Sequence, residues 1–332
     1  MRRLILWVLL VVIGVGAVSS SKFFARNPTP VQPQVVEIPK QIPTPTKQLS
    51  SAPLVAANKL FERVQQLSFE RYTKRDRARV RNYITQSLKN LGWFPTLQSF
   101  AEGVNIVAER LGSDPQAGTI LVAAHYDTVS GSPGADDNAS GVATMLEIAR
   151  IFASLPTPQT LKLAFFDAEE IGLRGSLAFA TDKANLVNLQ GVVVMDMIGF
   201  ACYSAGCQKY PPGLPVITPS DKGDFLVVVG DTEHLPLLNA FAGVKGDKLP
   251  AVLTLPIPLK GIFTPDVLRS DHAPFWYQGI GAVLVTDTAN LRSPYYHQSS
   301  DTPAKIERSF FSGAAQVVVD AVYQLLEEPQ IK

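Results

Sequence analysis

The sequence contains few residues that could bind a metal through sulfur or imidazole. It has only two cysteines, Cys202 and Cys207, which do not form a CxxC pair, and only four histidines. Counting alone therefore excludes a zinc site built from cysteine thiolates, which needs more thiolates at closer spacing. The histidines are few enough that each one can be assessed separately.

The chain also lacks an excess of charge of either sign. Its formal net charge is +1, so it has no basic surface of the kind that binds nucleic acid, and no nucleic-acid partner is expected. Charged residues make up 18% and hydrophobic residues 46% of the 332 residues. This length and composition are sufficient for a large core in an α/β domain.

The N-terminal part of the chain has two distinct compositions. Residues 1–21 begin with Met1-Arg2-Arg3 and continue as an apolar, uncharged stretch, which is the pattern of a signal peptide or an N-terminal membrane anchor. Residues 22–53 are rich in proline and are predicted to form an extended linker. We therefore expect an exported protein that is secreted, periplasmic or membrane-anchored, with its folded domain outside the cytoplasm. The N-terminal segment would then contact the membrane.

Export also bears on the two cysteines. In an oxidising compartment, Cys202 and Cys207 are expected to form a disulfide, with two free thiols as the alternative.

The rest of the chain, residues 54–332, alternates between helical and strand patterns. Apolar spacing predicts helices over 54–67, 76–91 and 140–152, a helix after 172–175, and a terminal helix from about Pro303 to Leu326. Dense apolar runs predict strands over 105–109, 118–124, 161–166, 191–194, 225–229 and 282–285. The alternation predicts one α/β domain with three layers, α/β/α, around a central mixed, mainly parallel sheet.

Acidic and histidine residues follow several of these strands. They are His125 and Asp127 after the second, Glu169 and Glu170 after the third, Asp196 after the fourth, and His297 in a loop after the sixth. The carboxyl ends of parallel strands share one edge of a sheet, so these groups can converge there with Asp137. So many carboxylates would raise one another's pKa unless cations offset their charge. A pair of divalent cations would do so, and the nitrogen and oxygen ligands suit zinc. Taken by itself, the stretch 125–141 could equally be a strand end and a capped helix.

The motifs around these residues resemble a known family, the M28 co-catalytic zinc peptidases. They are HYDT at 125–128, GADDNASG at 134–141, DAEEIGLRGS at 167–176, MDM at 195–197, SDH at 270–272 and YYHQSSDT at 295–302. They occur in the family's order, and the resemblance extends from about residue 54 to the end of the last helix. It implies a zinc-exopeptidase-like fold and two Zn²⁺ ions per chain.

The resemblance also implies a role for each metal ligand. Asp137 would bridge the two ions, His125 and Asp196 would complete the shell of one, and Glu170 and His297 that of the other.

Three further residues receive roles by the same resemblance. Glu169 would be the general base, because a carboxylate beside a ligand can reach a water molecule without binding the same metal. Asp127 would orient His125 from outside the ligand shell. Tyr296 resembles a tyrosine that polarises the substrate carbonyl.

Other polar residues are assigned structural roles. His234 is expected at a helix start and His272 is expected to support the site rather than to bind metal. Asp136 is interpreted as a loop residue beside the ligands, Asp301 as a helix cap, and Tyr203 as a residue bordering the substrate cleft.

The predicted function is zinc-dependent hydrolysis of peptides with a free N-terminus, that is, aminopeptidase activity. One alternative is a single-zinc transferase similar to glutaminyl cyclases, against which the segments DDNASG and GLRGS argue. The other is a non-catalytic ectodomain that serves as a binding module, which is disfavoured because every ligand and the base are present. The walls of the substrate pocket are expected from loops 200–218 and 249–264.

Overall fold

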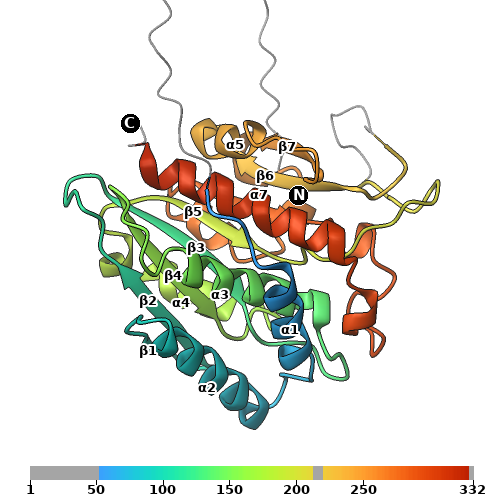
Figure 1. Ribbon diagram of the computed structural model, residues 1–332, viewed down its shortest axis with the longest axis horizontal. Helices are drawn as coiled ribbons and strands as arrows, with labels where there is room; N and C mark the ends of the chain where they lie inside the picture. The colour runs from blue at the N-terminus through green and yellow to red at the C-terminus, as the bar shows by residue number, and fades with distance from the viewer. Residues whose placement is uncertain (1–51, 212–219, 329–332) are drawn as a thin grey trace, which may run out of the picture. The chain divides into compact units, whose positions relative to one another are not determined.

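The computed structural model describes residues 52–211 and 220–328 (Figure 1). The predicted signal or anchor and nearly all of the predicted linker lie outside the described residues.

Within the described residues, eight strands form one mixed sheet in the order β1-β2-β4-β3-β5-β8-β6-β7. The strands are β1 (Thr96–Ser99), β2 (Val104–Arg110), β3 (Thr119–His125), β4 (Thr160–Phe166), β5 (Leu189–Met195), β6 (Phe225–Asp231), β7 (Ala251–Ile257) and β8 (Ala282–Thr286). The four strands β4, β3, β5 and β8 are parallel neighbours, and β6 pairs with β7 in parallel as well. The pairs β1–β2, β2–β4 and β6–β8 are antiparallel. The predicted mixed sheet is confirmed.

Helices cover both faces of this sheet (Figure 1). One face carries α1 (Ala57–Leu67), α2 (Lys74–Asn90), α3 (Gly141–Ile151), α5 (Leu235–Ala242) and α7 (Arg308–Glu327), and the other carries α4 (Arg174–Thr181) and α6 (Ala273–Tyr277). Successive residues of a strand point to opposite faces. In β3, Ile120 and Val122 accordingly join one hydrophobic core, and Leu121 and Ala123 join the other. The three predicted layers are therefore present.

Among the described helices, α7 is long and apolar enough to cross a bilayer, by length and composition alone. Its most apolar window is 78% buried against the rest of the domain. In this structure α7 is a core helix, and its apolar residues pack against the sheet.

Two local predictions were wrong. Residues 249–264, expected as a loop, contain strand β7. The terminal helix does not begin at Pro303: a short 3₁₀ turn covers Pro303–Lys305, and α7 starts at Arg308 after Glu307, whose side chain caps it. The first helix also starts slightly later than expected, at Ala57.

Candidate metal centre

The candidate ligands lie where the central parallel strands end. His125 is the last residue of β3, Asp196 directly follows β5, and Glu169 and Glu170 lie in the turn between β4 and α4. Strands β4 and β5 both pair with β3 in parallel, so their carboxyl ends meet at one edge of the sheet. The fold therefore brings together side chains that are far apart in the sequence.

Asp137 reaches the same place from the turn η1 (Ala135–Ser140), which precedes α3. The carboxylate of Asp301 holds this turn, since it accepts hydrogen bonds from the backbone N–H groups of Asp136 (3.0 Å) and Asp137 (3.1 Å). Asp301 was interpreted as a helix cap, and the structure shows that it caps this distant turn rather than the 3₁₀ turn that follows it in the chain. Asp136 lies beside the ligands and accepts a hydrogen bond from the N–H of Gly199.

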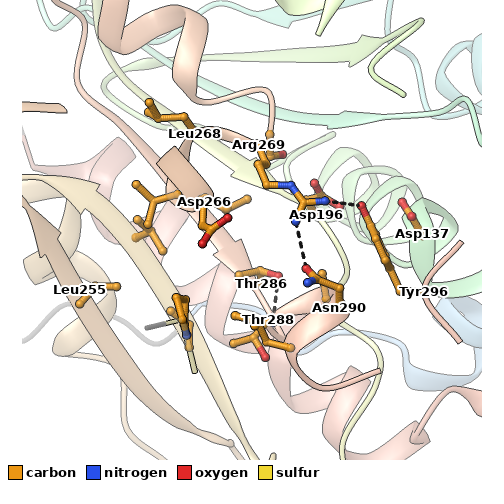
Figure 2. Close-up of a pocket in the computed structure, with 18 of the residues that line it drawn as sticks. Asp137, Asp196, Leu255, Asp266, Leu268, Arg269, Thr286, Thr288, Asn290 and Tyr296 are labelled. Atoms are coloured by element: carbon orange, nitrogen blue, oxygen red, sulfur yellow. Dashed lines mark hydrogen bonds between the residues drawn. The ribbon is translucent and has the colours of Figure 1, made fainter. Parts of the chain in front are cut away.

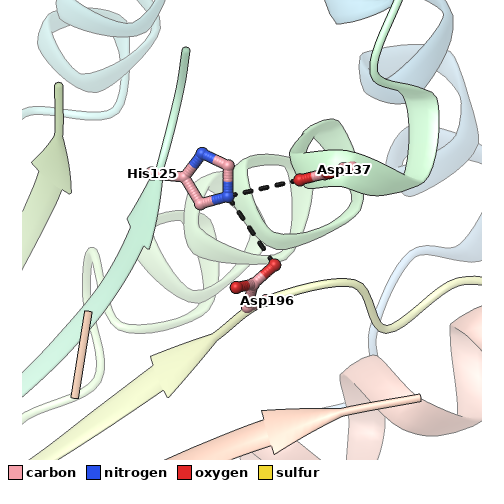
Figure 3. A group of neighbouring side chains, drawn as sticks. All are labelled: His125, Asp137 and Asp196. Atoms are coloured by element: carbon pink, nitrogen blue, oxygen red, sulfur yellow. Dashed lines mark ion pairs between the residues drawn. The ribbon is translucent and has the colours of Figure 1, made fainter. Parts of the chain in front are cut away.

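The two oxygens of Asp137 face two different histidines. Oδ1 lies 3.4 Å from His125 Nε2, and Oδ2 lies 3.3 Å from His297 Nε2. Asp196 Oδ1 lies 3.6 Å from the same nitrogen of His125, as Figure 3 shows. On the other side, Glu170 Oε2 lies 3.0 Å from His297 Nε2. Asp137 therefore belongs to two ligand groups at once.

The charges in this centre depend on one another. Burial and the negative charge of Asp137 raise the pKa of Glu170 to about 7. Burial would lower the pKa of His297, but the carboxylates of Asp137 and Glu170 outweigh it and raise that pKa to about 10. Burial would raise the pKa of Asp137, but His125 and His297 outweigh it and lower that pKa below its ordinary value. Positive charge near these carboxylates therefore favours their ionised form, and a bound cation would supply such charge.

The donor set fits divalent metal ions. In each of three groups, every residue offers one ligand atom, and these atoms all lie within 4.8 Å of one another. The groups are His125/Asp137/Asp196, His125/Glu169/Glu170 and Asp137/Glu170/His297. Among the described residues, Glu170 Oε1 is buried and has no hydrogen-bond partner, and His297 Nε2 faces the carboxylate oxygens of Asp137 and Glu170. Imidazole nitrogen and carboxylate oxygen atoms are the ligands that zinc takes in proteins.

Asp127 contacts more than the histidine that it was expected to orient. Its Oδ1 lies 3.5 Å from His125 Nδ1. Its two oxygens also accept hydrogen bonds from the backbone N–H groups of Glu169 (3.1 Å) and Glu170 (3.2 Å). One carboxylate thus fixes the end of β3 relative to the turn after β4.

A cavity of about 560 Å³ opens beside the candidate ligands. Its wall includes apolar side chains of β6, β7 and β8, namely Val227, Val229, Leu253, Leu255 and Leu284. Of the predicted wall segments, 200–218 contributes Gln208, Lys209, Tyr210 and Pro211 among its described residues, and 249–264 contributes the two leucines of β7. The segments 266–270 and 288–291 also line the cavity and were not predicted. The first overlaps the motif SDH at Ser270, and this motif was the signal that could have indicated it.

Tyr296 and Arg269 lie at the junction between the cavity and the ligands (Figure 2). Arg269 Nη2 donates a hydrogen bond to Tyr296 Oη at 3.2 Å, and its Nη1 donates one to Asn290 Oδ1 at 3.3 Å. The ring of Tyr296 stacks on that of His297, with centroids 3.7 Å apart. Arg269 therefore holds the hydroxyl group of Tyr296, and the candidate ligand His297 packs against its ring.

The remaining singled-out residues lie outside the ligand groups. His234 precedes α5 and its Nδ1 lies 2.7 Å from Asp231 Oδ1. His272 is buried, contacts Val267 O through Nε2 at 2.8 Å, and packs edge-on against Trp276. Tyr203 is 57% exposed and does not line the cavity.

The predicted disulfide is present, between Cys202 and Cys207. It lies in the segment that leads from β5 to β6.

Comparison of the sequence with protein families gives a match to Peptidase family M28 over residues 105–322. Among curated proteins, the chain is 34% identical over 67% of its length to the uncharacterized protein YfbL of Escherichia coli, and the match covers 70% of YfbL. It is 28% identical over 63% of its length to the aminopeptidase YwaD of Bacillus subtilis, covering 41% of that protein. It is 37% identical over 68% of its length to a probable zinc metalloprotease of Pyricularia oryzae, covering 50% of that protein. The chain thus spans about half or less of the latter two relatives.

Solved structures share the fold. An aminopeptidase from Aneurinibacillus sp. strain AM-1 superposes with a TM-score of 0.51 at 28% identity, covering 69% of this chain and 50% of that one. A glutaminyl cyclase from Bacteroides thetaiotaomicron superposes with a TM-score of 0.59 at 16% identity, covering 82% of this chain and 99% of that one. At that identity the second likeness concerns the fold alone.

Proposed function

Since this chain belongs to peptidase family M28, a family of zinc peptidases, we propose that it is a dizinc aminopeptidase that releases amino acids from the N-termini of peptides. The observation that carries the proposal is the position of Asp137, whose two oxygens face His125 and His297 at 3.4 Å and 3.3 Å. A carboxylate with one oxygen toward each of two ligand groups is suited to bridge two cations.

The proposed ligands follow from these groups. His125 and Asp196 would hold one zinc ion, Glu170 and His297 the other, and Asp137 both. When bound, two zinc ions supply Lewis-acid chemistry that polarises a peptide carbonyl and makes a water molecule more acidic.

Glu169 is the proposed general base. It lines the cavity beside the ligands, and burial raises the pKa of its carboxyl group well above the ordinary value. The N–H of Glu169 is tied to Asp127, so its backbone is fixed while its carboxylate stays directed to the cluster. The carboxylate would accept a proton from the attacking water and transfer it to the departing amine.

Tyr296 would act on the substrate carbonyl. Because Arg269 donates to Tyr296 Oη, the hydroxyl proton is not needed for that bond and can be donated to the carbonyl oxygen. Glu169, which binds no metal in this proposal, also lines the cavity, and its negative charge would attract the positively charged α-amino group of a free N-terminus. This favours exopeptidase action.

The cavity also indicates the side chain that would fit at the cleaved end. Its wall on β6, β7 and β8 is made of valine and leucine, and it begins beside the candidate ligands. An apolar N-terminal side chain would gain from burial there, by about 25 cal/mol per Å² of apolar surface. We therefore expect leucine-like and aromatic N-terminal residues to be preferred over alanine.

A comparison of free and blocked peptides tests this function. Purified protein loaded with zinc is incubated with Leu-Ala-Ala and N-acetyl-Leu-Ala-Ala, and the released leucine is measured. Release from the free peptide alone is the expected result, and equal cleavage of both would contradict the aminopeptidase proposal. The same sample is offered a peptide with N-terminal glutamine: cyclisation without release of amino acids would favour the glutaminyl cyclase alternative.

The N-terminal organisation is proposed from composition alone. Residues 1–21 would be a signal peptide or anchor, 22–53 a linker, and 54–332 the peptidase domain outside the cytoplasm. Cell fractionation followed by N-terminal sequencing of the mature protein tests this organisation. A full-length protein in the cytosolic fraction would contradict it.

A further inference from the structure

Arg71 lies between α1 and α2, before the residues that match the family. Its side chain is only 1% exposed. The guanidinium donates hydrogen bonds to six backbone carbonyl oxygens, those of Tyr126 (2.8 Å), Leu67 (2.5 Å), Phe69 (3.0 Å), Pro133 (2.9 Å), Gly134 (2.9 Å) and Asp137 (3.4 Å). All three of its nitrogens are thus bonded inside the protein, which holds the group in one position.

Four of these carbonyls belong to the chain that connects two candidate metal ligands. Residues 126–134 link His125 to the turn that carries Asp137, and they form neither helix nor strand. The guanidinium bonds this loop at its start, at its end, and at Asp137 itself. The loop has no regular pattern of backbone hydrogen bonds to fix its conformation. The hydrogen bonds from Arg71 to its carbonyl oxygens take over this role.

The backbone is shaped to allow this close approach. Gly134 has φ +59°, and a Cβ at this position would lie 2.6 Å from Arg71 Nη2. The backbone N–H of Arg71 also donates to Thr128 Oγ1 at 2.9 Å, so Arg71 bonds to this loop through its backbone as well as through its side chain. The loop is therefore closed around the guanidinium group.

The charge of Arg71 also matches its surroundings. Burial lowers the pKa of Arg71 to about 10, and the negative charges of Asp137, Asp301, Asp127 and Glu170 oppose this effect. The side chain therefore stays protonated at neutral pH and is a buried cation close to these four carboxylates.

We propose that Arg71 is a positioning residue of the metal centre, which sets the separation between His125 and Asp137 by bonding the loop between them. It touches neither metal nor substrate and acts through the backbone of Asp137. This inference rests on the proposed function in so far as these two residues bind zinc.

Zinc affinity of the metal-free protein tests the proposal. The full chain is stripped with a chelator, and zinc binding is followed by competition with a chromophoric chelator in the wild type, Arg71→Lys and Arg71→Met. Residues that orient metal ligands typically contribute about 10- to 100-fold to affinity, and we expect a loss of that size in both variants. Lysine keeps the charge but, with one ammonium group, cannot replace the six bonds.

Arg63→Met is the matched control. Arg63, on α1, pairs with Glu147 of α3 at 2.7 Å, and neither residue belongs to the ligand groups. Its loss should lower the thermal unfolding temperature without changing zinc affinity.

Three results would overturn the proposal: Arg71 variants that lose stability but bind zinc like the wild type, full affinity in Arg71→Lys, or failure of both metal-free variants to fold. The last would make Arg71 a requirement of the fold itself. Failure of the proposed function is a separate result, because a wild-type protein that binds one zinc ion still permits the comparison of affinities.

Discussion

His297 Nε2 lies 3.3 Å from the Oδ2 atom of Asp137, whose other oxygen is turned toward His125. If each oxygen serves one ion, removing His297 should weaken only one of the two sites. We expect about two zinc ions per chain in the wild type and about one in His297→Ala after dialysis, measured by elemental analysis. His234→Ala is the control, because His234 binds Asp231 and lies outside the ligand groups. A wild type with a single tightly bound ion would instead support the cyclase-like alternative.

Glu169→Gln should separate chemistry from binding. The amide keeps the size of the side chain but cannot accept the proton of the attacking water, so kcat should fall by about 10²- to 10⁴-fold. Zinc content and thermal stability should stay at the wild-type level. Glu109→Gln, which changes an exposed glutamate paired with Lys162, should leave all three quantities unchanged. If Glu169→Gln kept an activity near that of the wild type, Glu169 would not be the general base.

The ligand positions could be predicted from the sequence because they depend on local patterns. A dense apolar run predicts a buried strand, and His125 and Asp196 stand directly at or after the end of one. Parallel pairing then brings such ends together without further information. The resemblance to family M28 supplied the roles, and the family match confirmed that resemblance.

Features that depend on distant residues could not be predicted in this way. The segment 249–264 was predicted to be a loop, yet Ala251–Ile257 within it, which includes Pro256, forms β7. Proline is tolerated there because β7 is an edge strand. On its outer side β7 has no neighbouring strand, so a residue there needs no backbone N–H for pairing. Likewise, the hydrogen bond between Asp301 and Asp137 joins residues 164 positions apart, which no local pattern indicates.

Asp301→Ala should destabilise the metal-free protein. It would leave the N–H groups of Asp136 and Asp137 buried without an acceptor, and each such group costs about 1–3 kcal/mol. The free energy of unfolding from urea titration should fall by an amount in that range or above it. Asp247→Ala, at an exposed position, is the control and should change the free energy by less than about 0.5 kcal/mol. An unchanged unfolding midpoint in Asp301→Ala would show that water replaces the carboxylate.

Glu147 should make the stability depend on pH. Burial would raise the pKa of Glu147, but hydrogen bonds from Arg150 and from the N–H of Ala56, together with the charge of Arg63, outweigh it and lower that pKa below 4.5. A carboxyl group with a depressed pKa stabilises the fold above its unfolded pKa, and this contribution is lost as the pH falls through the folded pKa. Glu147→Gln should therefore be less stable than the wild type at pH 7, and the difference should shrink below about pH 4. Urea unfolding of the wild type and of Glu147→Gln, at pH 7 and below about pH 4, measures this difference in the free energy of unfolding. A difference that is the same at the two pH values would contradict a lowered pKa of Glu147.

The last prediction concerns the apolar wall of the cavity. Val229 and Leu255 are paired neighbours on β6 and β7, and both line the cavity that opens beside the candidate ligands. In Leu255→Trp the larger ring would occupy space that a large substrate side chain needs, whereas the ligands and Glu169 stay in place. Because an apolar pocket distinguishes side chains by about 1–3 kcal/mol per methylene group, kcat/KM should fall at least about tenfold for peptides with N-terminal leucine or phenylalanine.

Two comparisons decide whether this effect comes from the pocket. Peptides with N-terminal alanine do not reach the wall, so their kcat/KM in Leu255→Trp should stay within about twofold of the wild type, a difference of less than about 0.5 kcal/mol. Leu97→Trp, at an exposed position of β1 far along the sheet order from β7, should alter neither substrate class. An equal loss for alanine and leucine would mean that the tryptophan disturbs the metal centre. An unchanged preference would mean that the N-terminal side chain binds elsewhere, because a side chain bound against β7 could not avoid the added ring.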